Sequence, residues 1–195
     1  MPTTGVELTT RRLILRALAP GDAAAIVDQV NDWNVVRYTS AIPYPYDRGM
    51  ADAFIAGQAA RWSSWPGDRV PDEEVAFAIE RSSDRQLVGC IGLQPAEVNG
   101  GLEFGYWIGK RHWGEGYASE AVARLAQFSF ERLKVEEIWA AAVPLNDASH
   151  RVLEKNGFAI VAAGERASEV RGHPLPVIIR KLTRAQWAAA QATFA

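Results

Sequence analysis

The sequence predicts an α/β fold whose central sheet is mixed, mostly antiparallel and flanked by helices. Three strand-like apolar stretches, 75–80, 87–94 and 102–108, are separated by short turns, which predicts an antiparallel meander. The third stretch is followed by a helical pattern at 118–134 and by another strand-like stretch at 137–143. Strand, helix and strand in that order predict a right-handed crossover between parallel strands, which makes the sheet mixed.

The N-terminal third is predicted to supply one strand and three helical segments. Residues 10–18 form the strand, and Asp22 is placed to cap a helix that ends near Asn31. A second helix-like piece covers 33–37, and a longer helical segment covers 50–62.

Two loops accompany these helices. Segment 39–49 is predicted as a loop because Pro43 and Pro45 exclude regular structure. It is either a surface loop anchored by two tyrosines or one wall of a substrate pocket, and the sequence leaves both interpretations open. Segment 63–74, which ends in three acidic residues, is predicted as a solvated loop.

Glycines follow the strands in the middle of the chain. Segment 81–86 and Asn99-Gly100-Gly101 are predicted as tight turns. After the strand at 102–108, Gly109, Gly114 and Gly116 allow the backbone to bend sharply or to approach a ligand closely. A strand, a glycine turn and a helix in that order leave free backbone N–H groups, which can bind an anion.

The glycine turn has a pattern of its own. Arg111-His112-Trp113-Gly114-Glu115-Gly116 fits Arg-x-x-Gly-x-Gly. It lacks the lysine and the serine or threonine of a P-loop, and Ser119 stands where the dinucleotide fingerprint needs its third glycine.

The segment after 137–143 is predicted as a short capped helix. Asn146 or Asp147 caps its start, and Gly157 is placed at the C′ position after its end. In that arrangement Leu153 and Phe158 make the usual hydrophobic contact across the helix end.

The chain is predicted to end in two strands and a helix. The strands cover 158–163 and 175–181, the polar segment 164–174 joins them, and 183–194 forms the helix. With 195 residues and 48% apolar content, we expect one domain with a proper core.

Charge, cysteine and histidine usage limit the classes of function. A net charge of −2 and a pI near 6.0 argue against nucleic-acid binding through bulk electrostatics. The single cysteine, Cys90, excludes an internal disulfide and fits a reducing cytosol, and no stretch approaches membrane-spanning length. His112, His150 and His173 lack the spacing of a metal site. We therefore expect a cytoplasmic protein without metal, membrane or nucleic-acid partners.

The strand, the glycine turn, the long helix and the capped helix together resemble the GNAT superfamily of acetyl-CoA-dependent N-acetyltransferases. The likeness is greatest to the branch that includes the ribosomal-protein N-terminal acetyltransferases, and it covers nearly the whole chain. It is carried by Thr-Arg-Arg-Leu-Ile-Leu-Arg at 10–16, Gly-Tyr-Trp-Ile at 105–108, Arg-His-Trp-Gly-Glu-Gly-Tyr-Ala at 111–118 and Asn-Asp-Ala-Ser-His-Arg-Val-Leu-Glu-Lys-Asn-Gly-Phe at 146–158. The resemblance implies a single N-acetyltransferase domain over residues 1–195, with the sheet splayed between its fourth and fifth strands to admit acetyl-CoA as the acetyl donor.

The resemblance also implies which residues hold coenzyme A. The amides from about Trp113 to Ala118 would receive the pyrophosphate, and the backbone of 106–108 would pair with the pantetheine arm. Asn146 would bind that arm from the other side. The implied set is Tyr106, Trp107, Ile108, Arg111, Trp113, Gly114, Glu115, Gly116, Tyr117, Ala118, Asn146 and Arg151.

Attack of an amine on a thioester needs a base, fixed donors for the oxyanion and a proton donor for the thiolate. Glu103 is the first candidate for the base, and Glu165 and Glu169 are its rivals. Many members of the superfamily carry a tyrosine where this chain has Leu153. We therefore assign the proton donor to Ser149, one helical turn earlier, which can also cap its helix.

No pattern in the sequence identifies the acceptor. The resemblance implies a primary amine, which could be a protein N-terminus, a small amine or an antibiotic. A competing interpretation is a catalytically inactive acyl-CoA-binding domain that acts as a sensor or partner. The sequence also leaves a homodimer open.

Overall fold

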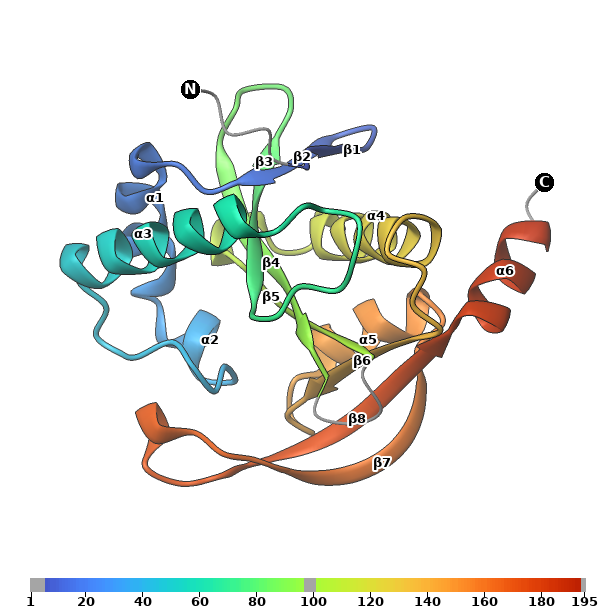
Figure 1. Cartoon of the computed structure of the whole chain (residues 1–195). Coiled ribbons are helices and arrows are strands. Elements are labelled where there is room, and N and C mark those ends of the chain that lie inside the picture. Colours follow the sequence, from blue (N-terminus) through green and yellow to red (C-terminus); the bar gives the residue numbers. More distant parts are fainter. Residues whose placement is uncertain (1–5, 97–100, 194–195) are drawn as a thin grey trace.

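The computed structural model of the chain describes residues 6–96 and 101–193. Its strands are β1 (Leu8–Thr9), β2 (Leu13–Ala17), β3 (Val75–Arg81), β4 (Leu87–Pro95), β5 (Leu102–Ile108), β6 (Glu137–Ala142), β7 (Ala159–Arg166) and β8 (Leu175–Thr183). Within the described residues these eight strands form one sheet in the order β1-β2-β3-β4-β5-β6-β8-β7 (Figure 1). Only the β5–β6 pair is parallel among them, which confirms the mixed, mostly antiparallel sheet.

Helices cover both faces of the sheet. They are α1 (Ala23–Val30), α2 (Trp33–Val36), α3 (Arg48–Ser64), α4 (Tyr117–Glu131), α5 (Asp147–Lys155) and α6 (Arg184–Thr193). Apolar side chains of α4 and α5 pack on one face, with the end of α3, and those of α1, α2 and the first half of α3 pack on the other. We call these the α4 face and the α1 face. Helix α6 continues from β8 and extends away from the sheet (Figure 1).

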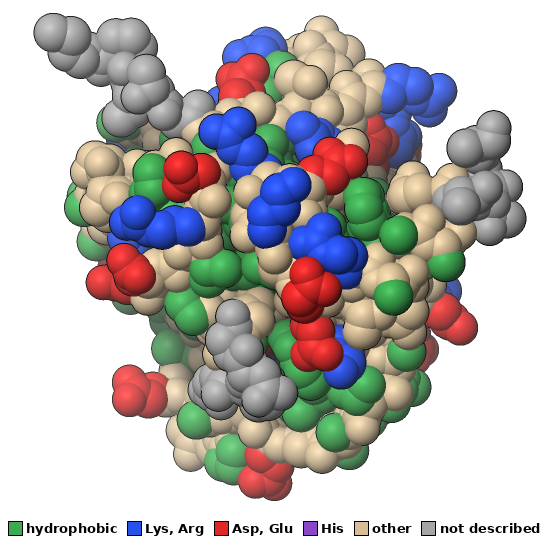
Figure 2. All heavy atoms as spheres, turned by 45° about the vertical axis from the view of Figure 1, so that its right-hand side comes forward, with side chains coloured by type: hydrophobic (Ala, Val, Ile, Leu, Met, Phe, Trp, Pro, Cys, Tyr) green, Lys and Arg blue, Asp and Glu red, His purple; other side chains and the backbone are tan. Residues whose placement is uncertain are grey.

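The alternation along β5 assigns its side chains to the two faces. Leu102 and Phe104 are buried in the core under α4, and Trp107 packs with the side chains under α1. Because neighbouring residues of a strand point to opposite faces, Glu103 and Gly105 lie on the α1 face with Trp107. On the outer surface, acidic and basic side chains are interspersed over the face drawn in Figure 2.

Helix α5 ends as its sequence predicts. The N–H of Phe158 donates to the carbonyl of Leu153 at 3.0 Å, and that of Gly157 donates to the carbonyl of Glu154 at 2.9 Å. Gly157 has a φ of 82°, the left-handed conformation expected at C′. At the other end, the side chain of Asn146 accepts from the N–H of Ser149 and caps the helix.

Asp22 occupies the N-cap position of α1, as predicted, but its side chain makes no capping hydrogen bond to that helix. Its carboxylate accepts from the N–H of Ala19 at 2.7 Å and from the guanidinium of Arg16 at 2.8 Å. Arg16 also bonds Glu80 of β3 at 2.6 Å. Asp22 is buried, and an ion pair with Arg16 compensates its charge better than the helix start could.

Other differences concern element boundaries. The strand predicted at 10–18 covers only Leu13–Ala17, and β1 precedes the predicted range. Thr10 turns the chain between β1 and β2 by accepting a hydrogen bond from the N–H of Leu13 at 2.8 Å. Strand β7 extends through Arg166, which removes three residues from the predicted polar connection. The predicted turn Asn99-Gly100-Gly101 lies, apart from Gly101, outside the described residues.

Candidate active site

A gap opens in the sheet between β5 and β6. Residues 102–104 pair with 138–140, but from Gly105 onward β5 pairs only with β4, and from Ala141 onward β6 pairs only with β8. These are the fourth and fifth strands of the sequence-based prediction, so the predicted splay is confirmed.

The backbone of Tyr106 faces this gap. The N–H of Gly109 donates to the carbonyl of Val88 in β4 at 2.9 Å. Since polar backbone groups alternate between the edges of a strand, those of Tyr106 and Ile108 point the other way, toward β6. The carbonyl of Ile108 accepts from the indole N–H of Trp113 at 2.7 Å. The amide and carbonyl of Tyr106 remain for a ligand that enters the gap.

Two hydroxyl groups meet on the α4 face of the gap. The phenol oxygen of Tyr106 lies 2.7 Å from the Oγ of Ser149 in the first turn of α5. Burial raises the pKa of Tyr106 to about 12, so the phenol keeps its proton at neutral pH. The amide nitrogen of the Asn146 side chain makes no hydrogen bond to another described residue. Sequence reasoning assigned only the backbone of Tyr106 and missed its hydroxyl.

The glycine turn before α4 presents free backbone amides. Gly114 and Gly116 both have a φ of 81°, a conformation that needs glycine. The N–H groups of residues 114–118 make no hydrogen bond within the described part of the chain. The N–H of Trp113 donates to the carbonyl of Lys110 at 3.2 Å, so the free set begins one residue later than predicted.

Arg12 of the β1–β2 turn braces the glycine turn. Its guanidinium donates to the carbonyl of Glu115 at 3.0 Å and to the carboxylate of Glu120 at 2.7 Å, and it lies over the ring of Tyr117. Burial alone would raise the pKa of Glu120, but hydrogen bonds from Thr10 and Arg12 lower it overall. Sequence reasoning missed this contact because the partners are more than a hundred residues apart.

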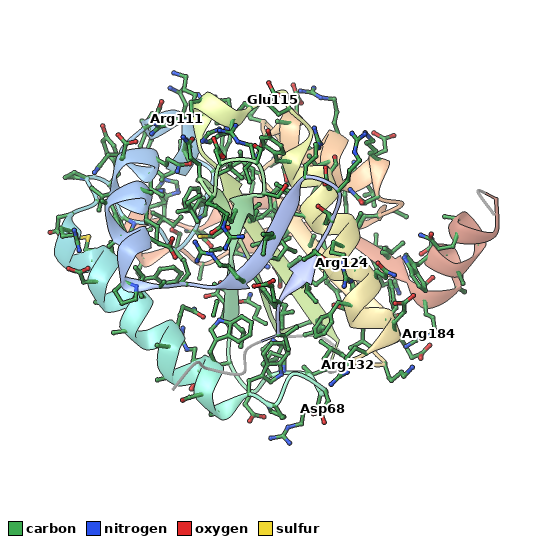
Figure 3. The ribbon with its side chains drawn as sticks, turned by 90° about the horizontal axis from the view of Figure 1, so that it is seen from above. Asp68, Arg111, Glu115, Arg124, Arg132 and Arg184 are labelled. Atoms are coloured by element: carbon green, nitrogen blue, oxygen red, sulfur yellow. The ribbon has the colours of Figure 1, made fainter. Side chains whose placement is uncertain are left out.

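The remaining predicted cofactor residues lie around this turn. Arg111 and Glu115 are at the same end of the molecule, beside the start of α4 (Figure 3). Arg111 bonds the carboxylate of Asp28 on α1, and Trp113 and Glu115 are exposed. Arg151 is exposed on α5 and has no ion pair among the described residues.

A carboxylate lies on the α1 face beside the gap. Glu103 is 8% exposed, and its Oε1 lies 2.5 Å from the guanidinium of Arg166 on β7. Its two rivals for the role of base, Glu165 and Glu169, are exposed on the β7–β8 hairpin. Glu103 is thus the candidate base that the structure places next to the gap.

The loop predicted at 39–49 and the connection between β7 and β8, which could both contact an acceptor, are hydrogen-bonded to each other. The hydroxyl of Ser168 donates to the carbonyl of Ser40 at 2.8 Å, and Arg171 donates to the carbonyl of Ile42 at 2.9 Å. The guanidinium of Arg171 also lies over the exposed ring of Trp33, 5.2 Å from its centroid. Figure 1 shows the β7–β8 connection reaching toward α2.

Two kinds of feature are absent from the described ranges. No group of three or more His, Cys, Asp or Glu side chains there could hold a metal ion. No helix in those ranges combines the length and apolarity needed to cross a membrane.

A family model described as an acetyltransferase (GNAT) domain matches residues 12–159. The chain belongs to the GNAT family. One relative, the uncharacterized N-acetyltransferase YoaA of Bacillus subtilis (strain 168), is 33% identical over 152 residues, which cover 77% of this chain and 81% of YoaA. The chain is an N-acetyltransferase that uses acetyl-CoA as its donor.

Solved structures of similar proteins have the same fold. RimJ of Mycobacterium smegmatis, in complex with CoA-disulfide, superposes with a TM-score of 0.76 at 20% identity and covers 97% of both chains. Spermidine N-acetyltransferase from Vibrio cholerae, in complex with CoA and spermine, has a TM-score of 0.72 at 20% identity, covering 92% of this chain and 99% of that one. The GNAT fold expected from the sequence resemblance is confirmed.

Proposed function

We propose that this enzyme transfers the acetyl group of acetyl-CoA to a primary amine, either a protein N-terminus or a small amine, by direct attack. The observation that carries the proposal is the gap between β5 and β6, which has the Tyr106–Ser149 hydroxyl pair on one face and Glu103 on the other. A thioester in this gap would lie between a proton donor and a base.

The residues present fit the donor. The free amides of 114–118 lie at the start of a 15-residue helix, where the helix dipole favours an anion such as the pyrophosphate. The Tyr106 backbone would pair with the pantetheine arm from β5, and the unbonded side-chain amide of Asn146 would donate from the side of α5. Arg151, exposed on α5, is free to meet a phosphate.

The chemistry follows from these positions. The amine nitrogen attacks the thioester carbonyl carbon, and the oxyanion that forms would accept from the N–H of Tyr106. Glu103, directly or through water, accepts the proton that the amine loses. As the carbon–sulfur bond breaks, the thiolate takes a proton from Ser149, and Ser149 takes one from the phenol of Tyr106. The phenolate then regains a proton from solvent, and Glu103 releases the proton of the amine to solvent. The products are the amide and free coenzyme A.

Two assays together test the proposal. Release of the coenzyme A thiol is measured over a panel of peptides and small amines, and the thermal shift is measured with acetyl-CoA and with coenzyme A. We expect stabilisation by both and turnover with at least one amine. Stabilisation without acetylation would support the inactive acyl-CoA-binding interpretation, and no stabilisation would contradict both.

We further infer that residues 1–195 form a single N-acetyltransferase domain in the cytoplasm. One sheet containing all the described strands supports the first part, and a buried free thiol, Cys90, supports the second. Absence of nucleic-acid and membrane partners stays a prediction, and a homodimer stays open.

A further inference from the structure

Glu74 is a second carboxylate on the α1 face, one residue before β3. Its Oε1 would lie 2.7 Å from a Cβ placed on Gly92 of β4, so the carboxylate lies directly over that glycine. It is half-buried and makes no hydrogen bond or ion pair within the described residues. Burial raises the pKa of Glu74, and the nearby Arg61, which opposes this, is already bonded to Glu73 at 2.8 Å.

A row of small residues leads from Glu74 to the gap. Ala76, Gly92 and Gly105 pair in register across β3, β4 and β5, and Ala141 of β6 follows the last paired residue on the far side. Gly105 is exposed, and a Cβ placed on it would meet no atom within 4 Å. The α1 face is therefore open between the carboxylate and the place where the thioester is proposed to lie.

The distance across this row suits binding better than proton transfer. Strands are about 4.8 Å apart, so Glu74 above β4 lies roughly 7 Å from the far edge of β5. A base must be within about 3 Å of the proton that it takes, or be joined to it by one water. Glu74 is too far for that role, whereas Glu103 on β5 itself is not.

Of Glu73, Glu74 and Glu103, only Glu74 has no cation beside it that compensates its charge. Glu103 is neutralised by Arg166 at 2.5 Å, and Glu73 by Arg61, but Glu74 has no partner in the described part of the chain. A half-buried carboxylate is stabilised most by a cation that hydrogen-bonds to it and is shielded from water together with it.

We infer that Glu74 binds a second cationic group of the acceptor, so that the enzyme prefers amines that carry an additional ammonium or guanidinium. This inference rests on the proposed function, because it needs the reacting amine in the gap. The second cation lies over Gly92, and the linking chain crosses Gly105. Glu74 is a specificity residue in this scheme, and Glu103 keeps the role of base.

The test compares matched acceptors and matched variants. Putrescine and butylamine have the same carbon chain and differ by one ammonium, and a peptide pair with lysine or norleucine after the N-terminal residue makes the same comparison on a peptide. The variants are Glu74→Gln and, as control, Asp72→Asn, which removes the charge of a nearby exposed acid and leaves Arg61 bonded to Glu73. Thermal shift with acetyl-CoA checks that each variant is folded and binds the donor.

We expect the wild-type kcat/KM to be about tenfold higher for the dicationic member of at least one pair, the effect of one charged hydrogen bond. Glu74→Gln should remove most of that preference, mainly through a higher KM for the dication, and Asp72→Asn should keep it. If the wild type shows no preference, the inference is overturned. This result does not depend on whether any variant folds. An equal loss on both members of a pair in Glu74→Gln would also overturn the inference. Failure of the wild type to acetylate any amine would instead contradict the proposed function, and the inference with it.

Discussion

The phenol of Tyr106 and the hydroxyl of Ser149 are hydrogen-bonded across 2.7 Å, although the residues are 43 positions apart. The tyrosine comes from strand β5 and the serine from helix α5. Many members of the superfamily place a tyrosine on the helix, at the position of Leu153, which is fully buried here. This chain therefore has a phenol in the same region that approaches from the strand.

Replacing Ser149 with alanine should lower kcat by about 100-fold, since it removes the donor next to the departing thiolate. The Kd of acetyl-CoA, measured by calorimetry, should change much less. Tyr106→Phe should lower kcat less than Ser149→Ala does. The double variant should lower kcat by less than the two single effects combined, because both groups belong to one proton path. An unchanged kcat in Ser149→Ala would reduce the serine to a helix-capping residue.

Gly116→Val should abolish acetyl-CoA binding. The left-handed backbone at φ 81° is unfavourable for a β-branched residue by about 1–3 kcal/mol, and the turn would rearrange to relieve it. Calorimetric titration with acetyl-CoA and the melting temperature report the two effects. Gly57→Ala, in the interior of α3 where a Cβ meets no atom within 4 Å, is the control and should be neutral or stabilising. Retained donor affinity in Gly116→Val would contradict the role of this turn.

Glu120→Gln should destabilise the glycine turn in a pH-dependent way. Because the folded pKa of Glu120 is lowered, its stabilisation is complete above the ordinary value of 4.5 and is lost as the pH falls through the folded value. Melting temperatures of wild type and variant should therefore differ at neutral pH and converge in acid. Glu131→Gln, an exposed acid at the end of the same helix, should show no such difference. A difference in melting temperature that persists in acid would mean that the effect does not come from the charge of Glu120.

Glu103→Gln should lower kcat by about 100-fold, because the amide cannot accept the proton of the attacking amine. Glu165→Gln and Glu169→Gln should stay within about twofold of the wild type, since both side chains are exposed on the hairpin. Steady-state kinetics with any accepted amine distinguish the three. If Glu165→Gln loses as much activity as Glu103→Gln, the hairpin must contribute to proton transfer.

Cys90 should resist alkylation in the folded protein. The thiol is buried in β4, and burial raises its pKa, so the reactive thiolate is scarce. Intact-mass spectrometry after iodoacetamide at mildly alkaline pH should show an unmodified native chain and a fully modified chain in denaturant. Rapid labelling of the native protein would show that β4 opens locally.

Local patterns predicted much of this fold correctly. Two-residue periodicity identified the meander of β3, β4 and β5, and the capped helix from Asn146 to Gly157 followed from residue types alone. Such features depend on neighbours within a few positions, so the sequence states them directly. The splay between β5 and β6 followed from the family resemblance.

Long-range partners could not be predicted. The contact of Arg12 with Glu120, that of Glu103 with Arg166, and the position of Glu74 over Gly92 all depend on which strands become neighbours and in what register. Asp22 has the residue type and position of a helix cap, but its carboxylate pairs with Arg16 of β2, six positions earlier. Arg16 is held there in part by Glu80 of β3, which is a long-range partner.

The short parallel seam between β5 and β6 has a mechanical consequence. Among the described strands, three residue pairs are all that joins β1–β5 to β6, β8 and β7 by a backbone ladder. A pantetheine arm in the gap would add hydrogen bonds to the Tyr106 backbone of β5 on one side and to the Asn146 side chain on the other. Donor binding would then connect the two parts of the sheet more strongly, and release of coenzyme A would remove that connection. Each turnover would therefore make the sheet more rigid and then more flexible at the β5–β6 boundary.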